Sequence, residues 1–240
     1  MTDSERIFQS DWLIKYYTFV KLDYINFNKK NTKSKFLEPF LGYGNSSTLN
    51  WVGLPNLEEV NGEIINLAIT SNSNKNNILI DNLATKENFL KRIQNPTNKI
   101  VISTHAVPRN WLGLTKEPAL VFNSYKGDIF LSPSEIIQLN IDSEMIVLSS
   151  CNANTKGFNE IPKAFLTAGA QTVVYTNWNL DSKFAGDFTS SFFSDLWYFD
   201  TPKHIALRNT SLKFLNDYSN SNYSNPSFWG NFSIVYSNLN

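Results

Sequence analysis

Residues 99–105 read KIVISTH, and residues 145–151 read MIVLSSC. In both stretches a short aliphatic run passes through small hydroxyl residues and ends on a reactive side chain, His105 in the first and Cys151 in the second. Nearly continuous apolar runs of this length are typical of strands buried in a parallel sheet. Open α/β sheets carry their sites at the carboxyl ends of such strands. If the two strands are neighbours, the pattern predicts that an imidazole and a thiol meet at one edge of the sheet.

The rest of the chain alternates short β-rich runs with longer segments of helical period. This alternation favours an α/β fold with a mostly parallel central sheet and helices on both of its faces. The expected strands are residues 40–43, 77–80, 99–104, 119–122, 144–150, 172–176 and 232–236. The expected helices are residues 58–69, 86–94, 160–168 and 182–197, a short helix behind a capping box at Ser132, and one that starts at Thr201 and Pro202.

The size and charge of the chain exclude several classes of function. Its 240 residues, 42% of them hydrophobic, suit one large domain. Basic and acidic residues both number 21, so the chain lacks the basic field that direct binding of nucleic acid or anionic lipid needs. No apolar run approaches the ~20 residues that span a bilayer, and residues 1–10 are too polar for a secretory signal. We therefore expect a cytoplasmic protein that binds neither nucleic acid nor membrane.

Cysteine and histidine are scarce, which narrows the search for a reactive site. One cysteine and two histidines rule out an internal disulfide and leave little to bind a metal, so we expect no metal and no cofactor. A thiol enzyme here can use only Cys151, with His105 or His204 as its imidazole. His204 lies one turn into the helix after Pro202, where a surface position is the simplest expectation, so it should be dispensable.

The pair Cys151 and His105 can support nucleophilic catalysis. A thiol with an ordinary pKa of ~8.5 is mostly protonated at neutral pH, and a nearby imidazole can take its proton. Cys151 would attack a peptide carbonyl and His105 would protonate the leaving amine, with the backbone N–H groups of Cys151 and Ala106 holding the oxyanion. A lone cysteine is more often a small buried hydrophobe. The polar residues on both sides of Cys151 favour a turn instead.

Residues 99–106 and 145–154 resemble the His and Cys motifs of the CHAT domain, a relative of caspases and separases. Further segments occur in the order of that family: residues 36–45, 54–60, 84–89, 164–170, 178–181, 206–208 and 226–229. The resemblance covers residues 36–237. Cys151 follows His105 by 46 residues, close to the ~50 that separate the two in caspases.

The resemblance implies a caspase-like (caspase-hemoglobinase) fold and cysteine endopeptidase activity on protein substrates. On this basis residues 36–240 form the peptidase domain, and residues 1–35 are an N-terminal extension or an incomplete start of it. Domains of this family usually follow helical repeats or other sensor modules. The chain would then be the effector of a sensor-regulated stress, defence or cell-death system, controlled by such a domain or partner.

Two departures from the family pattern favour a second function, a catalytically inactive caspase-like scaffold. The family generally has glycine after the histidine, where this chain has Ala106; if that position needs a positive φ, a Cβ costs roughly 1 kcal/mol or more. The turn at residues 152–159 is also shorter and poorer in glycine than in the family.

Three residues are candidates for binding substrate. By resemblance to separase-like relatives, Asp181 would receive a basic side chain of the substrate, although it is also suited to be the N-cap of the helix that starts at Ser182. Asn152 would orient substrate backbone, although turn chemistry alone would select it. Trp178 would line the same pocket, and its alternative is packing in the core or at its rim.

Overall fold

The computed structural model describes residues 12–19, 21–22, 38–46, 53–124, 127–149, 159–217 and 223–237. Their largest element is a seven-stranded sheet in the order β1-β10-β9-β8-β4-β2-β3. Its strands are β1 (Lys21–Leu22), β2 (Glu38–Gly44), β3 (Ile78–Leu79), β4 (Thr97–Ser103), β8 (Met145–Leu148), β9 (Thr172–Thr176) and β10 (Phe232–Tyr236). All neighbouring pairs are parallel except β9 and β10. The mostly parallel central sheet is therefore confirmed.

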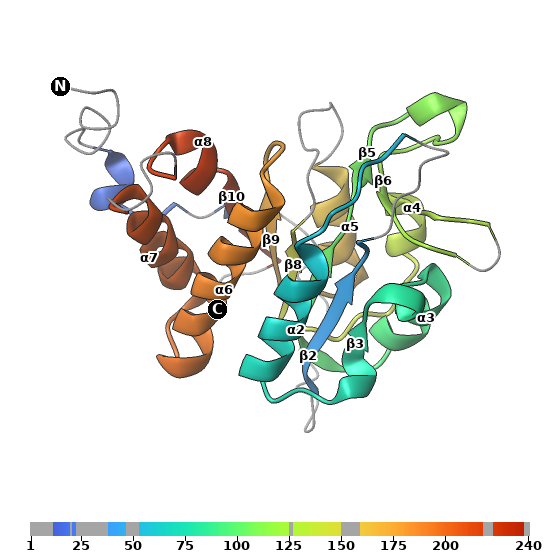
Figure 1. Cartoon of the computed structure of the whole chain (residues 1–240), viewed down its shortest axis with the longest axis horizontal. Helices are drawn as coiled ribbons and strands as arrows, with labels where there is room; N and C mark the ends of the chain where they lie inside the picture. Colours follow the sequence, from blue (N-terminus) through green and yellow to red (C-terminus); the bar gives the residue numbers. More distant parts are fainter. Residues whose placement is uncertain are drawn as a thin grey trace.

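Helices cover both faces of this sheet, as expected (Figure 1). The helices are α2 (Val60–Thr70), α3 (Lys86–Ile93), α4 (Pro133–Ile136), α5 (Glu160–Ala168), α6 (Ser182–Tyr198), α7 (Lys203–Leu215) and α8 (Pro226–Trp229). One buried cluster joins α3, α4 and α5 to Ile100 and Ile102 of β4, and another joins α2, α6 and α7 to Val101. Because successive side chains of a strand point to opposite faces, β4 contributes to both cores. Among the described helices, none combines the length and apolarity needed to cross a membrane.

Several helix ends follow the local signals in the sequence. Thr85 caps α3 by accepting a hydrogen bond from the Asn88 N–H at 3.2 Å. The capping box expected at Ser132 is present, although α4 has only four residues. Helix α5 ends at Gly169, whose φ of 127° is open to glycine because it has no Cβ.

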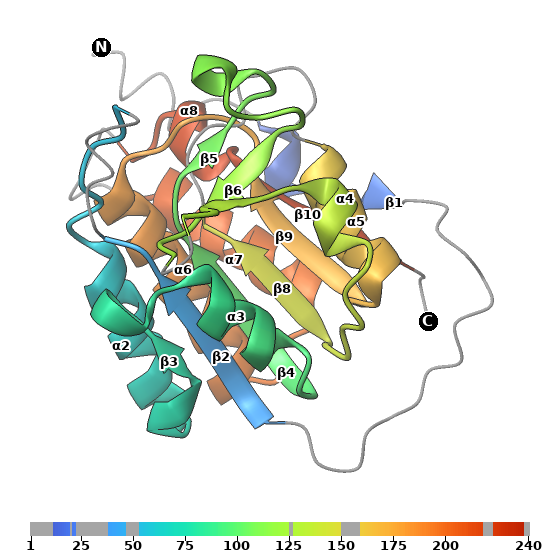
Figure 2. The same cartoon turned by 90° about the vertical axis from the view of Figure 1, so that its right-hand side faces the viewer.

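The strand expected at residues 119–122 is present, but it does not belong to the central sheet. It is β6 (Ala119–Val121), which lies in a separate antiparallel sheet with β5 (Ala106–Val107) and β7 (Phe130–Leu131). In Figure 2 the arrowheads of β2 and β8 point toward the end of the central sheet where β5 and β6 lie. The small sheet therefore sits beyond the edge at which His105 follows β4.

Residues 12–19 pack against helices α7 and α8. The η1 turn (Leu13–Lys15) lies against α7, where the Arg208 side chain donates to the backbone oxygens of Ile14 and Lys15. The Trp12 ring meets Trp229 edge-on at a centroid distance of 5.5 Å. Residues 12–19, which fall in the expected N-terminal extension, are thus attached to the domain.

Candidate active site

The carboxyl ends of adjacent strands bring polar residues to one edge of the central sheet. Strands β4 and β8 are neighbours, which confirms the condition on which the predicted site depended. Asn45 follows β2 and donates its N–H to the Ser103 oxygen at 3.0 Å. Ser149 follows β8 and donates its N–H to the Ile102 oxygen, also at 3.0 Å. The carboxyl end of β4, which His105 follows, therefore lies beside the carboxyl end of β8.

His105 is held in one orientation by the backbone of a distant segment. Its side chain is buried, and Nε2 lies 2.7 Å from the carbonyl oxygen of Pro55. Because a carbonyl oxygen can only accept, Nε2 carries the proton, and the neutral ring keeps its lone pair on Nδ1. Burial lowers the pKa of His105, and the bond to Pro55 opposes this shift. The imidazole is therefore disposed to be neutral and to accept a proton at Nδ1.

The Pro55 carbonyl is brought to His105 by an apolar contact. Leu54 is buried in a cluster with Val107, Ala119, Val121 and Ile129, so the small antiparallel sheet fixes this turn. This contact could not be predicted from the residue types, because a main-chain oxygen acts through its position alone.

Ala106 fits its position without strain. It is buried, starts β5 and has no positive φ, so the expected cost of a Cβ does not arise. His105 accepts a hydrogen bond from Val121 N–H at 2.8 Å, and Ala106 is paired with Leu120. Hydrogen-bonded and non-bonded pairs alternate along antiparallel strands, so the Ala106 N–H is directed away from β6.

Cys151 and Asn152, two of the predicted site residues, lie outside the described residues. Before Cys151, the last described residues are Leu148, which ends β8, and Ser149, which follows it. The register pairs Ile102 with Leu148. In sequence, His105 and Cys151 each come three residues after a member of this pair.

Trp178 and Asp181 follow β9, the strand next to β8. Asp181 accepts a hydrogen bond from Phe184 N–H at 3.0 Å and is the N-cap of α6, which confirms that alternative. Half-buried Trp178 is tied to the chain around α8, because its Nε1 donates to the Ser227 oxygen at 2.7 Å and its N–H donates to Asn231 Oδ1 at 2.9 Å. A role of either residue in binding substrate stays a prediction.

One further buried group at this edge was missed at the sequence level. Glu63 of α2 is only 5% exposed and accepts a hydrogen bond from the Ser103 hydroxyl at 2.8 Å. It stands on the apolar stripe of its helix with Val60, Ile64 and Leu67. An acidic residue within such an apolar stripe was the signal in the sequence that could have indicated a buried carboxyl group.

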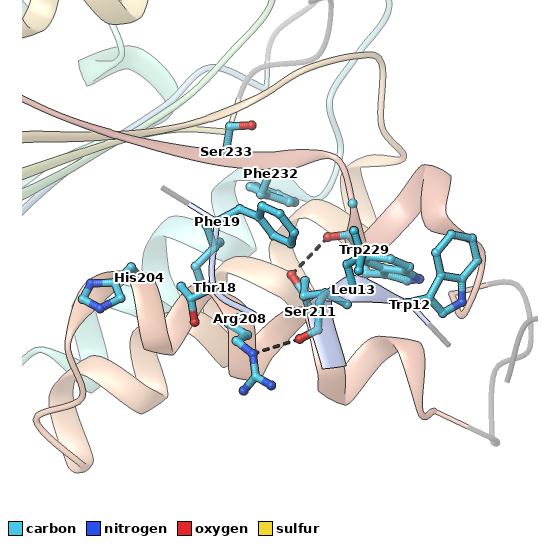
Figure 3. Close-up of a pocket in the computed structure, with 13 residues that line it drawn as sticks. Trp12, Leu13, Thr18, Phe19, His204, Arg208, Ser211, Trp229, Phe232 and Ser233 are labelled. Carbon is cyan, nitrogen blue, oxygen red and sulfur yellow. Dashed lines mark hydrogen bonds between the residues drawn. The ribbon is translucent and has the colours of Figure 1, made fainter. Parts of the chain in front are cut away.

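A cavity of about 380 Å³ lies at the other side of the sheet, between residues 12–19, α7 and the start of β10 (Figure 3). Its polar groups are largely engaged with the protein itself: Arg208 binds residues 14 and 15, and Ser211 donates to the Trp229 oxygen at 3.1 Å. His204 lines it and lies 3.4 Å from the Tyr236 hydroxyl. Strands β8, β9 and β10 separate this cavity from β4. His204 is thus partly covered, and it is remote from the edge that carries His105.

A mostly parallel sheet with helices on both faces, and with a buried imidazole after a central strand, defines a domain of caspase-like fold. The CHAT domain model matches residues 6–237. The chain belongs to the CHAT domain family, as the motifs around His105 and Cys151 predicted.

Solved structures support the same fold. The chain is similar to the arginine-specific cysteine proteinase gingipain R, with a TM-score of 0.53 and 11% identity over 83% of this chain and 46% of the other. It is also similar to a complex of the pro- and mature domains of the Porphyromonas gingivalis enzyme, with a TM-score of 0.52 and 14% identity over 83% of this chain and 47% of the other. The chain spans about half the length of these structures. No curated protein matches the chain.

Proposed function

We propose that the chain is a cysteine endopeptidase that cleaves protein substrates through Cys151 and His105. The observation that carries the proposal is the register of β4 and β8. Ile102 and Leu148 are paired, and the histidine and the cysteine follow them at equal separation in the sequence. The paired strands end side by side at one edge of the sheet, where open α/β sheets carry their sites, and the histidine follows directly after one of these ends.

The orientation of His105 sets the direction of proton transfer. With Nε2–H donated to Pro55, Nδ1 takes the proton of the Cys151 thiol as sulfur bonds to the carbonyl carbon of the substrate. The imidazolium then gives this proton to the nitrogen of the leaving amine as the C–N bond breaks. In the second half, Nδ1 takes a proton from water, the hydroxide attacks the thioester, and the proton returns to the sulfur. Each proton that His105 receives is thus returned.

Backbone N–H groups supply the stabilisation of the oxyanion in this proposal. The Ala106 N–H is available because the pairing of β5 with β6 directs it away from that strand. The Cys151 N–H is the second donor. Fixed donors of this kind contribute to the rate because they need no reorganisation as charge develops on the substrate oxygen.

Asp181 and Trp178 are proposed to bind the side chain before the scissile bond, and Asn152 to bind substrate backbone. Asp181 uses one carboxylate oxygen as the cap of α6, which leaves the other able to accept from a basic group. Gingipain R is described as arginine-specific. We therefore propose arginine as the preferred residue at that position. We also propose, from the family resemblance, that the protein is cytoplasmic and that a sensor domain or partner controls its activity.

Covalent labelling tests the proposal directly. The purified chain is treated with peptidyl acyloxymethyl ketones that carry Arg, Lys, Leu or Asp next to the reactive group, and adducts are counted by intact-protein mass spectrometry. The wild type should gain one adduct, fastest with Arg, whereas Cys151→Ala and His105→Ala should gain none. His204→Ala is the matched control, because it removes the other imidazole, which lies across the sheet, and it should label like the wild type.

Labelling that survives His105→Ala would show a thiol that reacts without its partner, and would contradict the dyad. A wild-type chain that no reagent labels would instead favour the inactive scaffold. One of the two departures that favoured the scaffold has lost its basis, since Ala106 has an ordinary backbone conformation.

A further inference from the structure

A buried carboxyl group stands directly behind the edge that carries His105. Glu63 is on α2, which packs against β2 and α6. Its side chain is 5% exposed, and Oε2 accepts a hydrogen bond from Ser103 Oγ at 2.8 Å. Burying an acid in this way is costly unless its oxygens are bound. Its place therefore calls for an explanation beyond packing.

The hydroxyl bound by Glu63 lies between the ends of two strands. Ser103 is the last residue of β4 and comes two residues before His105. Its Oγ is also 3.3 Å from the Ser149 oxygen, which belongs to the residue two before Cys151. Glu63 thus fixes the orientation of a hydroxyl that, among the described residues, lies against both strand ends.

Two more hydroxyls face the same carboxyl group. The side chains of Ser149 and Thr189 lie close enough to lower the pKa of Glu63, although neither reaches hydrogen-bond geometry with it. Within the described part of the chain, Glu63 Oε1, Ser149 Oγ and Thr189 Oγ1 are all buried without a hydrogen-bond partner. These rotatable hydroxyls can donate a hydrogen bond to the charged carboxylate or accept one from the neutral acid. The polar cluster therefore joins β4, the end of β8, α2 and α6.

We propose that Glu63 is a positioning residue for the pair His105 and Cys151: through Ser103 and Ser149 it fixes the relative placement of the strand ends that precede them. This role rests on the proposed peptidase function, but it makes a separate claim about the geometry. We infer that Glu63 acts through where the two strands end and not by contact with the reacting groups. A misplacement of about 1 Å can cost on the order of 100-fold in a rate.

The surroundings of Glu63 explain why a carboxyl is tolerated there. Burial raises its pKa to about 7, and the hydroxyls of Ser103, Thr189 and Ser149 oppose this shift. These hydroxyls come from β4, from α6 and from the residue after β8, and none of them is charged. Near neutral pH both the neutral and the charged form are therefore accessible, and either form can bond to a hydroxyl.

Inactivation kinetics separate this role from a merely structural one. The rate constant of the bound reagent (kinact) and its concentration dependence (KI) are measured with the best ketone. Glu63→Ala should lower kinact on the order of 10- to 100-fold and leave KI unchanged. Glu63→Gln keeps an acceptor for Ser103 and should stay within about threefold of the wild type. Thr189→Val is the matched control: it removes a hydroxyl of the same cluster on α6, away from both strand ends, and should leave kinact unchanged.

Equal values of kinact for Glu63→Ala and Thr189→Val would overturn the positioning role. An equal fall of kinact in Glu63→Gln and Glu63→Ala would overturn it as well. A readout without catalysis distinguishes this failure from failure of the peptidase proposal. The chain has two histidines, so the ring signals of His105 and His204 can be assigned by NMR with His204→Ala. Glu63→Ala should displace the His105 signal and Thr189→Val should not, whether or not any reagent labels the protein. An unmoved His105 signal in Glu63→Ala would refute the inference by itself.

Discussion

The buried state of Glu63 predicts how the stability of the protein depends on pH. Burial raises its pKa to about 7, against 4.5 for the exposed group. Between these values the folded chain holds a proton that the unfolded chain has lost. Stability conferred by the neutral acid is therefore fully present below about pH 4.5, falls as the pH rises, and reaches its lower limit above about pH 7.

Glu63→Gln removes this titration while keeping the shape of the side chain. Each pH unit between the two pKa values is worth about 1.4 kcal/mol. The penalty in the wild type should therefore grow by about 2 to 3 kcal/mol between about pH 5 and about pH 8. The Glu63→Gln variant has no such penalty, so it should gain stability relative to the wild type by that amount over the same range.

Urea unfolding followed by tryptophan fluorescence measures this difference. The free energy of unfolding of the variant minus that of the wild type is plotted against pH, which cancels the contributions of all other titrating groups. The difference should rise with pH and level off above about pH 7. A difference that is constant with pH would show that the carboxyl is not held in a desolvated site, and the cluster with Ser103 would have to be abandoned.

Lys86→Met should destabilise the chain by about 2 to 3 kcal/mol in urea unfolding, because buried Lys86 binds two carboxylates at 2.6 and 2.7 Å that are themselves partly exposed. Arg208→Ala should speed trypsin cleavage after Lys15, since it removes the bonds that hold this segment; an unchanged cleavage rate would contradict that anchoring role. Asp181→Ala should cost about 1 kcal/mol as a lost cap, whereas Asp181→Asn should keep the cap and slow labelling by the Arg reagent but not by the Leu reagent. In NMR, His105 should titrate with a midpoint below 6.5, because burial lowers its pKa and keeps it neutral; a midpoint at or above 6.5 would contradict this.

The elements that form the site could be predicted because their signals are local. Residues 99–104 and 144–150 were expected as strands, and β4 and β8 occupy Thr97–Ser103 and Met145–Leu148. Residues 160–168 were expected as a helix with Gly169 behind it, and α5 has these bounds. An apolar run, a cap residue and a terminal glycine each act within a few residues, so the sequence alone carries them.

The strand pairing of β6 could not be predicted in the same way. A run of three apolar residues looks alike whether it is buried in a parallel sheet or in a short antiparallel one. The partners that decide the matter, Ala106–Val107 and Phe130–Leu131, are only two residues long. The contact between Pro55 and His105 was equally hidden, because it joins residues 50 positions apart through a backbone oxygen.

The interior of β4 and β8 does not by itself fix where the two strands end. Residues 100–102 and 145–148 are all apolar, and both faces of the sheet are covered by apolar cores. When both faces are buried, a slip of two residues along the strand exchanges one apolar side chain for another, so apolar burial specifies the register only weakly.

Polar contacts at the two ends supply the missing specification. At the start of the strands Lys99 pairs with Glu144 at 3.4 Å, and at their end Ser103 meets both Glu63 and the Ser149 oxygen. A slip would separate each of these groups from its partner and leave the buried ones unbonded, at a cost of about 1 to 3 kcal/mol for each. The register that pairs Ile102 with Leu148, each three residues before His105 or Cys151 in sequence, therefore depends on polar groups at the strand ends, and Glu63 is among these groups.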